Sequence, residues 1–188
     1  MQSLKWYTGS HRLSNTKLEI SIYPNAMYAE RGDVGWIPRN SGLCTFKYNS
    51  ECGLYEIVTE WMRRRGTAGY LFVKGHEEGH AILLLGQSER LFNALKERGY
   101  VFDFFRQDRV KELDRIAMQI LDVKKEVTQE DLSVLGTTEQ RDLIANCGSL
   151  IAFLQNGIDS NNLDYIVRRL QKEDPRSYYP RYDVINFS

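Results

Sequence analysis

The chain has 188 residues, of which 42% are hydrophobic, so it is long enough to bury one good core and lies at the upper end of the size range of a single domain. Lysine and arginine together number 25, as do aspartate and glutamate, so no net charge attracts nucleic acid or an anionic membrane. The longest apolar run, 81–85, is far shorter than the about 20 residues that a membrane span needs. We therefore expect a soluble protein with neither a nucleic-acid nor a membrane partner.

The cysteines favour a reducing environment. Cys44, Cys52 and Cys147 form an odd set without regular spacing, and the first residues lack the apolar stretch of an export signal. We expect a cytoplasmic protein in which Cys44 is a buried structural cysteine. The alternative is that the Cys44 thiolate binds a metal ion of the protein and so holds the protein in an inactive, latent form.

The amino-terminal part, residues 1–48, is predicted to form a small antiparallel sheet. Short segments rich in aromatic or β-branched residues alternate there with turn residues. The predicted strands are 4–8, 18–23, 27–29, 34–37 and 44–48. The next segment, 51–65, is predicted to be a helix, because its apolar residues recur at i, i+3, i+4, i+7 and i+8.

Residues 76–80 read His-Glu-Glu-Gly-His, which is the H-E-x-x-H pattern of zinc hydrolases. If residues 70–85 are helical, His76 and His80 lie on one face with Cβ atoms roughly 5–6 Å apart, close enough to share one ion. Glu77 then lies one step round the helix, where it reaches a water on the metal as a general base. On this reading Gly75 and Gly79 clear one side of the helix for a neighbouring backbone.

A β-hairpin is the competing structure for this segment. Residues 70–74 would pair with 81–85 across a loop of 75–80, and periodicity does not separate a short buried strand from a buried helix. The histidines would then be incidental.

The rest of the chain is predicted to be mainly helical. Helices are expected at 89–98 and 108–125, with an aromatic strand or plug at 100–105 between them. The helix 108–125 has an apolar stripe flanked by Glu112 and Asp114, and a catalytic H-E-x-x-H site needs a third protein ligand.

The carboxy-terminal segments complete the prediction. A capped turn is expected at 128–131, and helices at 138–155 and 161–172 supply a bundle core. Asp142, in the first turns of its helix, is either a metal ligand or a surface charge that suits the helix dipole. The aromatic tail, 174–188, is expected to dock on a single domain formed by residues 1–173, in which 51–125 holds the active-site helices and 128–173 is helical.

Two segments resemble the ImmA/IrrE-type zinc metallopeptidases. The segment 76–81, His-Glu-Glu-Gly-His-Ala, resembles that family's H-E-x-G-H helix. The segment 111–121, Lys-Glu-Leu-Asp-Arg-Ile-Ala-Met-Gln-Ile-Leu, is similar to its downstream helix, E-A-N/D-x-F-A-x-x-L-L, which supplies the third metal-binding carboxylate. The resemblance covers about residues 68–123 and implies Glu112 as that ligand.

The first segment also resembles, more weakly, the peptidase segment of FtsH-type proteases, in which the third ligand is a later aspartate. Glu78 departs from the ImmA/IrrE pattern, which usually has an apolar residue there. The extra carboxylate either raises a pKa in the pair with Glu77 or points into solvent.

Together these features predict an α+β fold: a small antiparallel sheet on a zincin-like active-site helix, followed by a helical bundle. The predicted activity is that of a zinc-dependent metallopeptidase acting on a protein or peptide. His76, His80 and Glu112 hold Zn²⁺ and Glu77 is the general base, while Asp114 and Asp142 remain alternatives to Glu112.

The oxyanion stabiliser is left open, with His11, Tyr70 and Tyr100 as candidates by residue type. The alternative function is a non-enzymatic interaction or regulatory protein with an incidental or structural metal site. Its contacts would come from residues 63–65 and the tail tyrosines.

Overall fold

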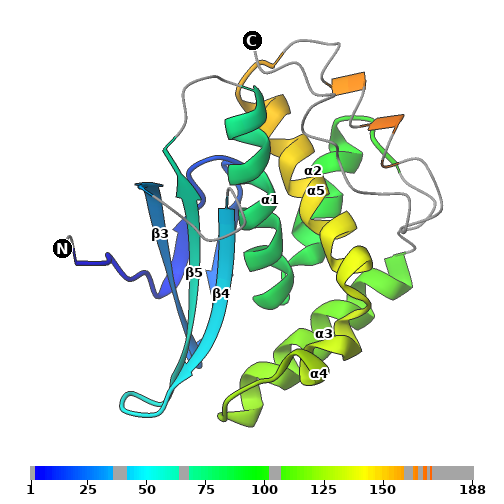
Figure 1. Cartoon of the computed structure of the whole chain (residues 1–188). Coiled ribbons are helices and arrows are strands. Elements are labelled where there is room, and N and C mark those ends of the chain that lie inside the picture. Colours follow the sequence, from blue (N-terminus) through cyan, green and yellow to red (C-terminus); the bar gives the residue numbers. More distant parts are fainter. Residues whose placement is uncertain are drawn as a thin grey trace.

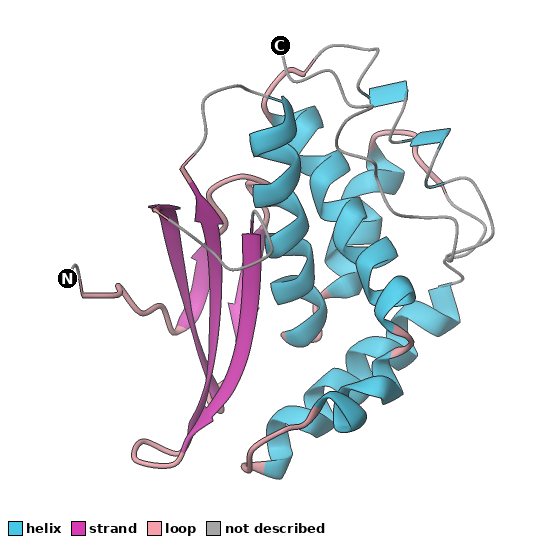
Figure 2. Ribbon diagram, in the orientation of Figure 1, coloured by secondary structure: helices cyan, strands magenta, loops and turns pink. Residues whose placement is uncertain are grey.

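The computed structural model describes residues 3–35, 42–63, 68–101 and 107–158, together with residues 163, 164, 167, 168 and 170. The elements are β1 (Gly9–Arg12), β2 (Glu19–Ile22), β3 (Ala26–Val34), β4 (Gly42–Asn49), β5 (Leu54–Met62), α1 (Ala68–Leu84), α2 (Ser88–Glu97), α3 (Gln107–Val123), α4 (Gln129–Leu132), the 3-10 turn η1 (Ser133–Leu135) and α5 (Thr138–Gln155). The fold is α+β, as predicted. The strands form one layer and the helices the other, with α1 between the three-stranded sheet and α5 (Figures 1 and 2).

The larger sheet is mixed, which corrects the prediction of an antiparallel one. Its strand order is β3-β5-β4, with β3 parallel and β4 antiparallel to the central strand β5. The separate two-stranded sheet of β1 and β2 is antiparallel. The predicted strand 4–8 is reduced to a bridge between Tyr7 and Tyr28. The predicted strand 34–37 lies largely outside the described residues.

The predicted helix 51–65 is wrong, because its central part is the strand β5. The segment is rich in β-branched and aromatic side chains, and alternate residues from Tyr55 to Trp61 are buried. Val58, on the other face, is buried as well, because β5 lies in the middle of the sheet. A strand with one buried face and apolar residues at Leu54, Val58 and Met62 on the other also satisfies the i, i+3, i+4 spacing of a helix, so the pattern alone does not separate the two.

The segment with the histidines is helical, which confirms the predicted helix and excludes the hairpin. Helix α1 lies beside α5 in Figure 1. The two helices pack against each other at Gly75 and Gly79 of α1. A Cβ atom on Gly75 would lie 2.7 Å from the carbonyl oxygen of Gly148, and one on Gly79 would lie 2.5 Å from that of Ala145. The two helices therefore approach backbone to backbone.

Side chains that accept backbone hydrogen bonds fix the starts of the later helices. Thr128 and Thr137 cap α4 and α5 in capping boxes, as predicted. The start of α2 is capped by a residue from another helix. The Asp114 carboxylate on α3 accepts hydrogen bonds from the backbone N–H groups of Ser88 and Glu89, at 2.7 and 2.9 Å.

The end of the chain is described only in part. Residues 163, 164, 167, 168 and 170 are helical, within the predicted helix 161–172, and Leu170 is buried in the core. Most of the aromatic segment 100–105 and the whole tail 174–188 lie outside the described residues. Among the helices that the structure describes, none has the length and apolar character of a membrane span.

Candidate metal centre

Four polar side chains face one another across the contact between α1 and α5. His76 and His80 are four residues apart on α1, and Asp142 and Asn146 are four apart on α5. The cap at Thr137 fixes where α5 begins, and the close glycine contact brings the two faces together.

The ligand atoms of three of these residues converge. The Nε2 atoms of His76 and His80 are 3.0 Å apart, and Asp142 Oδ1 lies 3.2 Å from His80 Nε2 and 3.8 Å from His76 Nε2. One ligand atom from each residue lies within 4.8 Å of the other two, and all three side chains keep some exposure to solvent. This is the spacing and donor set of a metal site with three protein ligands.

The third member of this cluster is Asp142, one of the two predicted alternatives to Glu112, and Glu112 is not part of the cluster. Glu112 lies on the exposed face of α3, where its carboxylate binds the guanidinium of Arg115. That hydrogen bond lowers the pKa of Glu112. Asp114 caps α2 and is not part of the cluster either. Spacing along the sequence allowed all three carboxylates, and only the helix packing selects Asp142.

The electrostatics prepare the histidines to bind a cation. Burial, and then the neighbouring His80, lower the pKa of His76 to about 4, so its ring is neutral at physiological pH. Burial raises the pKa of Asp142, but the hydrogen bond with His80 and the proximity of both histidines outweigh it, so the net shift is downward. A neutral imidazole and an ionised carboxylate are the forms in which these residues bind metals.

Glu77 lies beside this cluster, against Gly42, which is the first residue of the edge strand β4. Its side chain is 7% exposed, and a Cβ atom on Gly42 would lie 2.6 Å from Glu77 Oε1. Burial raises the pKa of Glu77 to about 7, with Asp142 adding to the shift and His80 opposing it. A carboxylate that is half ionised near neutral pH suits a general base.

Cys44 is on the same strand and close enough to Glu77 to feel its charge. Burial and then Glu77 raise the pKa of the Cys44 thiol well above its usual value. A protonated thiol is a poor metal ligand, and Cys44 is not a member of the cluster. Cys44 is partly buried and not fully buried as predicted, and its structural role stays a prediction.

Glu78, which departs from the family pattern, belongs to another part of the fold. It is fully buried and accepts hydrogen bonds from the backbone of Asn15 and Thr16 at 2.9 and 2.8 Å, and from the Asn15 side chain at 2.6 Å. Burial, with the charge of Glu30, raises its pKa to about 7. Glu78 therefore connects the turn between β1 and β2 to α1 by hydrogen bonds and does not point into solvent.

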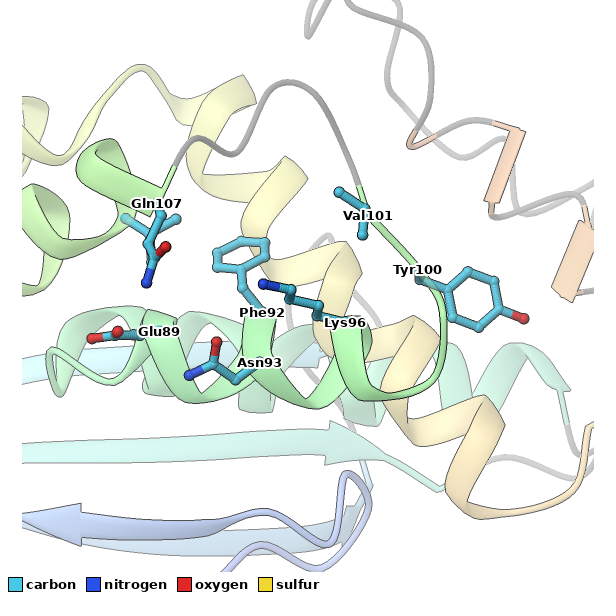
Figure 3. Close-up of a pocket in the computed structure, with 8 residues that line it drawn as sticks. Glu89, Phe92, Asn93, Lys96, Tyr100, Val101 and Gln107 are labelled. Carbon is cyan, nitrogen blue, oxygen red and sulfur yellow. The ribbon is translucent and has the colours of Figure 1, made fainter.

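The candidate oxyanion stabilisers contact other groups. His11 bonds Glu30 and stacks on Tyr7, and the Tyr70 hydroxyl donates to Asp33. Tyr100 lines a pocket of about 140 Å³ between α2 and the start of α3, shown in Figure 3. None of the cluster residues lines that pocket.

The residue that sequence reasoning missed is Asn146. Its Oδ1 lies 2.8 Å from His76 Nδ1, on the side of the ring away from the cluster. The available signal was its spacing, because Asn146 follows Asp142 by four residues and shares its helix face.

Comparison of the chain with protein-family models, with curated proteins and with solved structures finds no match.

Proposed function

We propose that this protein is a zinc-dependent hydrolase, specifically a peptidase. His76, His80 and Asp142 hold the ion, and Glu77 is the general base. The observation that carries the proposal is the convergence of three ligand atoms, from two helices, within 4.8 Å. Two imidazole nitrogens and one carboxylate oxygen suit zinc, and three protein ligands leave a position open, as catalytic sites require.

Each side chain has a defined task in this proposal. A zinc ion, when bound, acidifies a coordinated water and polarises a substrate carbonyl. Glu77, adjacent to His76 in the chain and buried against β4, would take a proton from the attacking water and pass it to the leaving group. Its pKa of about 7 matches a base that works near neutral pH. An aspartate on a later helix agrees with the FtsH-type resemblance rather than with the ImmA/IrrE one.

Metal analysis tests the ligand set. The wild-type protein should bind about one zinc per chain, and Asp142→Ala should lose most of that affinity. Glu112→Ala is the matched control, because it removes an exposed carboxylate outside the cluster and should bind zinc normally. Retention of full affinity by Asp142→Ala would disprove the ligand set.

Activity is tested separately with labelled casein as a general peptidase substrate. Glu77→Gln should keep zinc and lose hydrolysis by at least about 100-fold, the usual contribution of a general base. A Glu77→Gln protein that hydrolyses casein as fast as wild type would refute the catalytic role. Zinc binding without any hydrolysis by the wild type would favour the alternative, a protein with a structural metal.

A further inference from the structure

Asn146 is the one buried polar side chain of α5 that contacts a proposed ligand without belonging to the ligand cluster. It is 0% exposed, and its amide oxygen faces Nδ1 of His76 at 2.8 Å. An amide oxygen can only accept a hydrogen bond, so Nδ1 must carry the proton of the neutral ring. Nε2 of His76 is then left with its lone pair, pointing toward His80 and Asp142.

We infer that Asn146 is a positioning residue that locks His76 in the tautomer and ring orientation needed to bind the metal through Nε2. This inference rests on the proposed function. A metal-binding histidine is usually oriented by a partner on its other ring nitrogen, and loss of that partner typically weakens metal binding 10- to 100-fold. The partner is usually a carboxylate or a backbone carbonyl, and here it is a side-chain amide.

The surroundings of Asn146 argue against a role in folding alone. Its Nδ2 group is buried and has no hydrogen-bond partner within the described part of the chain. An unpaired buried N–H group is unfavourable for folding, and asparagine is a poorer helix former than leucine. A leucine of similar size would therefore suit the fold at least as well. What it would remove is the acceptor for His76.

The direct test is the tautomer of His76 in the metal-free protein, read from ¹⁵N-edited NMR spectra of the histidine rings at about pH 7.5, where the ring is neutral. The wild type should show His76 as the Nδ1–H form. Asn146→Leu, with the same shape but no acceptor, should shift it toward the Nε2–H form. Asn146→Asp keeps an acceptor and should restore the Nδ1–H form.

Zinc affinity, measured by competition with a chromophoric chelator, gives the second readout. Asn146→Leu should bind zinc 10- to 100-fold more weakly, whereas Asn146→Asp should bind within about threefold of wild type or more tightly. Ser149→Ala is the matched control. It removes another buried α5-to-α1 hydrogen bond, from Ser149 Oγ to the Phe72 carbonyl at 2.8 Å, and should leave zinc affinity unchanged.

The thermal melting temperature of each metal-free variant separates positioning from folding. Asn146→Leu should melt no lower than wild type while binding zinc more weakly. If the leucine variant does not fold, Asn146→Ala takes its place in the comparison with Asn146→Asp. Wild-type affinity and tautomer in Asn146→Leu would overturn the inference, as would equal weakening by the aspartate and leucine variants. A wild type that shows the Nδ1–H form but binds no zinc would refute the proposed function instead.

Discussion

The burial of Glu77 should make the metal-free protein less stable than a variant without that charge. The pKa of Glu77 is raised from 4.5 to about 7 in the folded state, chiefly by burial. Below the unfolded-state pKa of 4.5, the Glu77 carboxyl is protonated in both the folded and the unfolded protein, and its contribution to stability is complete. This contribution is lost as the pH rises through about 7, because the buried carboxyl then ionises. Between about pH 5 and about pH 8 the loss amounts to about 2–3 kcal/mol.

Glu77→Gln keeps the shape of the side chain and does not titrate. It should therefore resemble the wild type in stability at about pH 5 and exceed it by about 2–3 kcal/mol at about pH 8, while lacking hydrolytic activity. Glu78, whose pKa is also raised to about 7, titrates in both proteins and cancels in the difference. The assay is urea unfolding at both pH values with a chelator present, because bound metal would add stability of its own.

Two results would refute this reasoning. One is a stability difference between Glu77→Gln and wild type that does not change with pH. The other is a variant that is less stable than wild type at about pH 8. Either would mean that the carboxylate of Glu77 is well solvated or paired in the folded protein, contrary to its 7% exposure.

Three further predictions concern packing and capping, and urea unfolding measures each. In Gly79→Ala the added Cβ would lie 2.5 Å from an α5 carbonyl oxygen. The protein should lose about 2 kcal/mol or more of stability, although alanine is the better helix former, and a gain would show that the helices separate easily. Gly42→Ala should lose about 1–3 kcal/mol because its Cβ would lie 2.6 Å from Glu77 Oε1. Gly35→Ala, whose Cβ would meet no described atom within 4 Å, should stay within about 0.5 kcal/mol, and equal effects would count against the clash at Gly42. Asp114→Ala should lose about 1–2 kcal/mol with the cap of α2, whereas Glu112→Ala, on the exposed face of the same helix, should leave the stability unchanged. A neutral Asp114→Ala would rule out the cap.

The candidate ligands show how far local sequence reasoning reaches. His76 and His80 are on one helix, so their spacing alone puts them on one face, and the structure agrees. The third carboxylate is on another helix. The positions of Glu112, Asp114 and Asp142 relative to the histidines depend on how α3 and α5 pack, and no local rule contains that information.

The strand β5 and the role of Glu78 both depend on what covers a side chain in the folded protein. The helical spacing of residues 51–65 also fits a strand, and the sequence does not decide whether Glu78 has a raised pKa or points into solvent. β5 is the central strand of its sheet, and Glu78 is buried because the turn at Asn15 and Thr16 covers it. These partners are about 60 residues away from Glu78 in the chain.

The sequence by itself determined the α+β class and, for a helical segment, the shared face of His76 and His80 with Glu77 one step round it. The structure decided that the segment is a helix and not a hairpin. Spacing on a helix and capping residues act within a few turns of the chain, so they can be read directly once a segment is known to be helical. Only the tertiary structure decided that Asp142 completes the cluster and that Asn146 orients His76. The reason is the close backbone contact that Gly75 and Gly79 allow, since it sets which face of α5 meets the histidines.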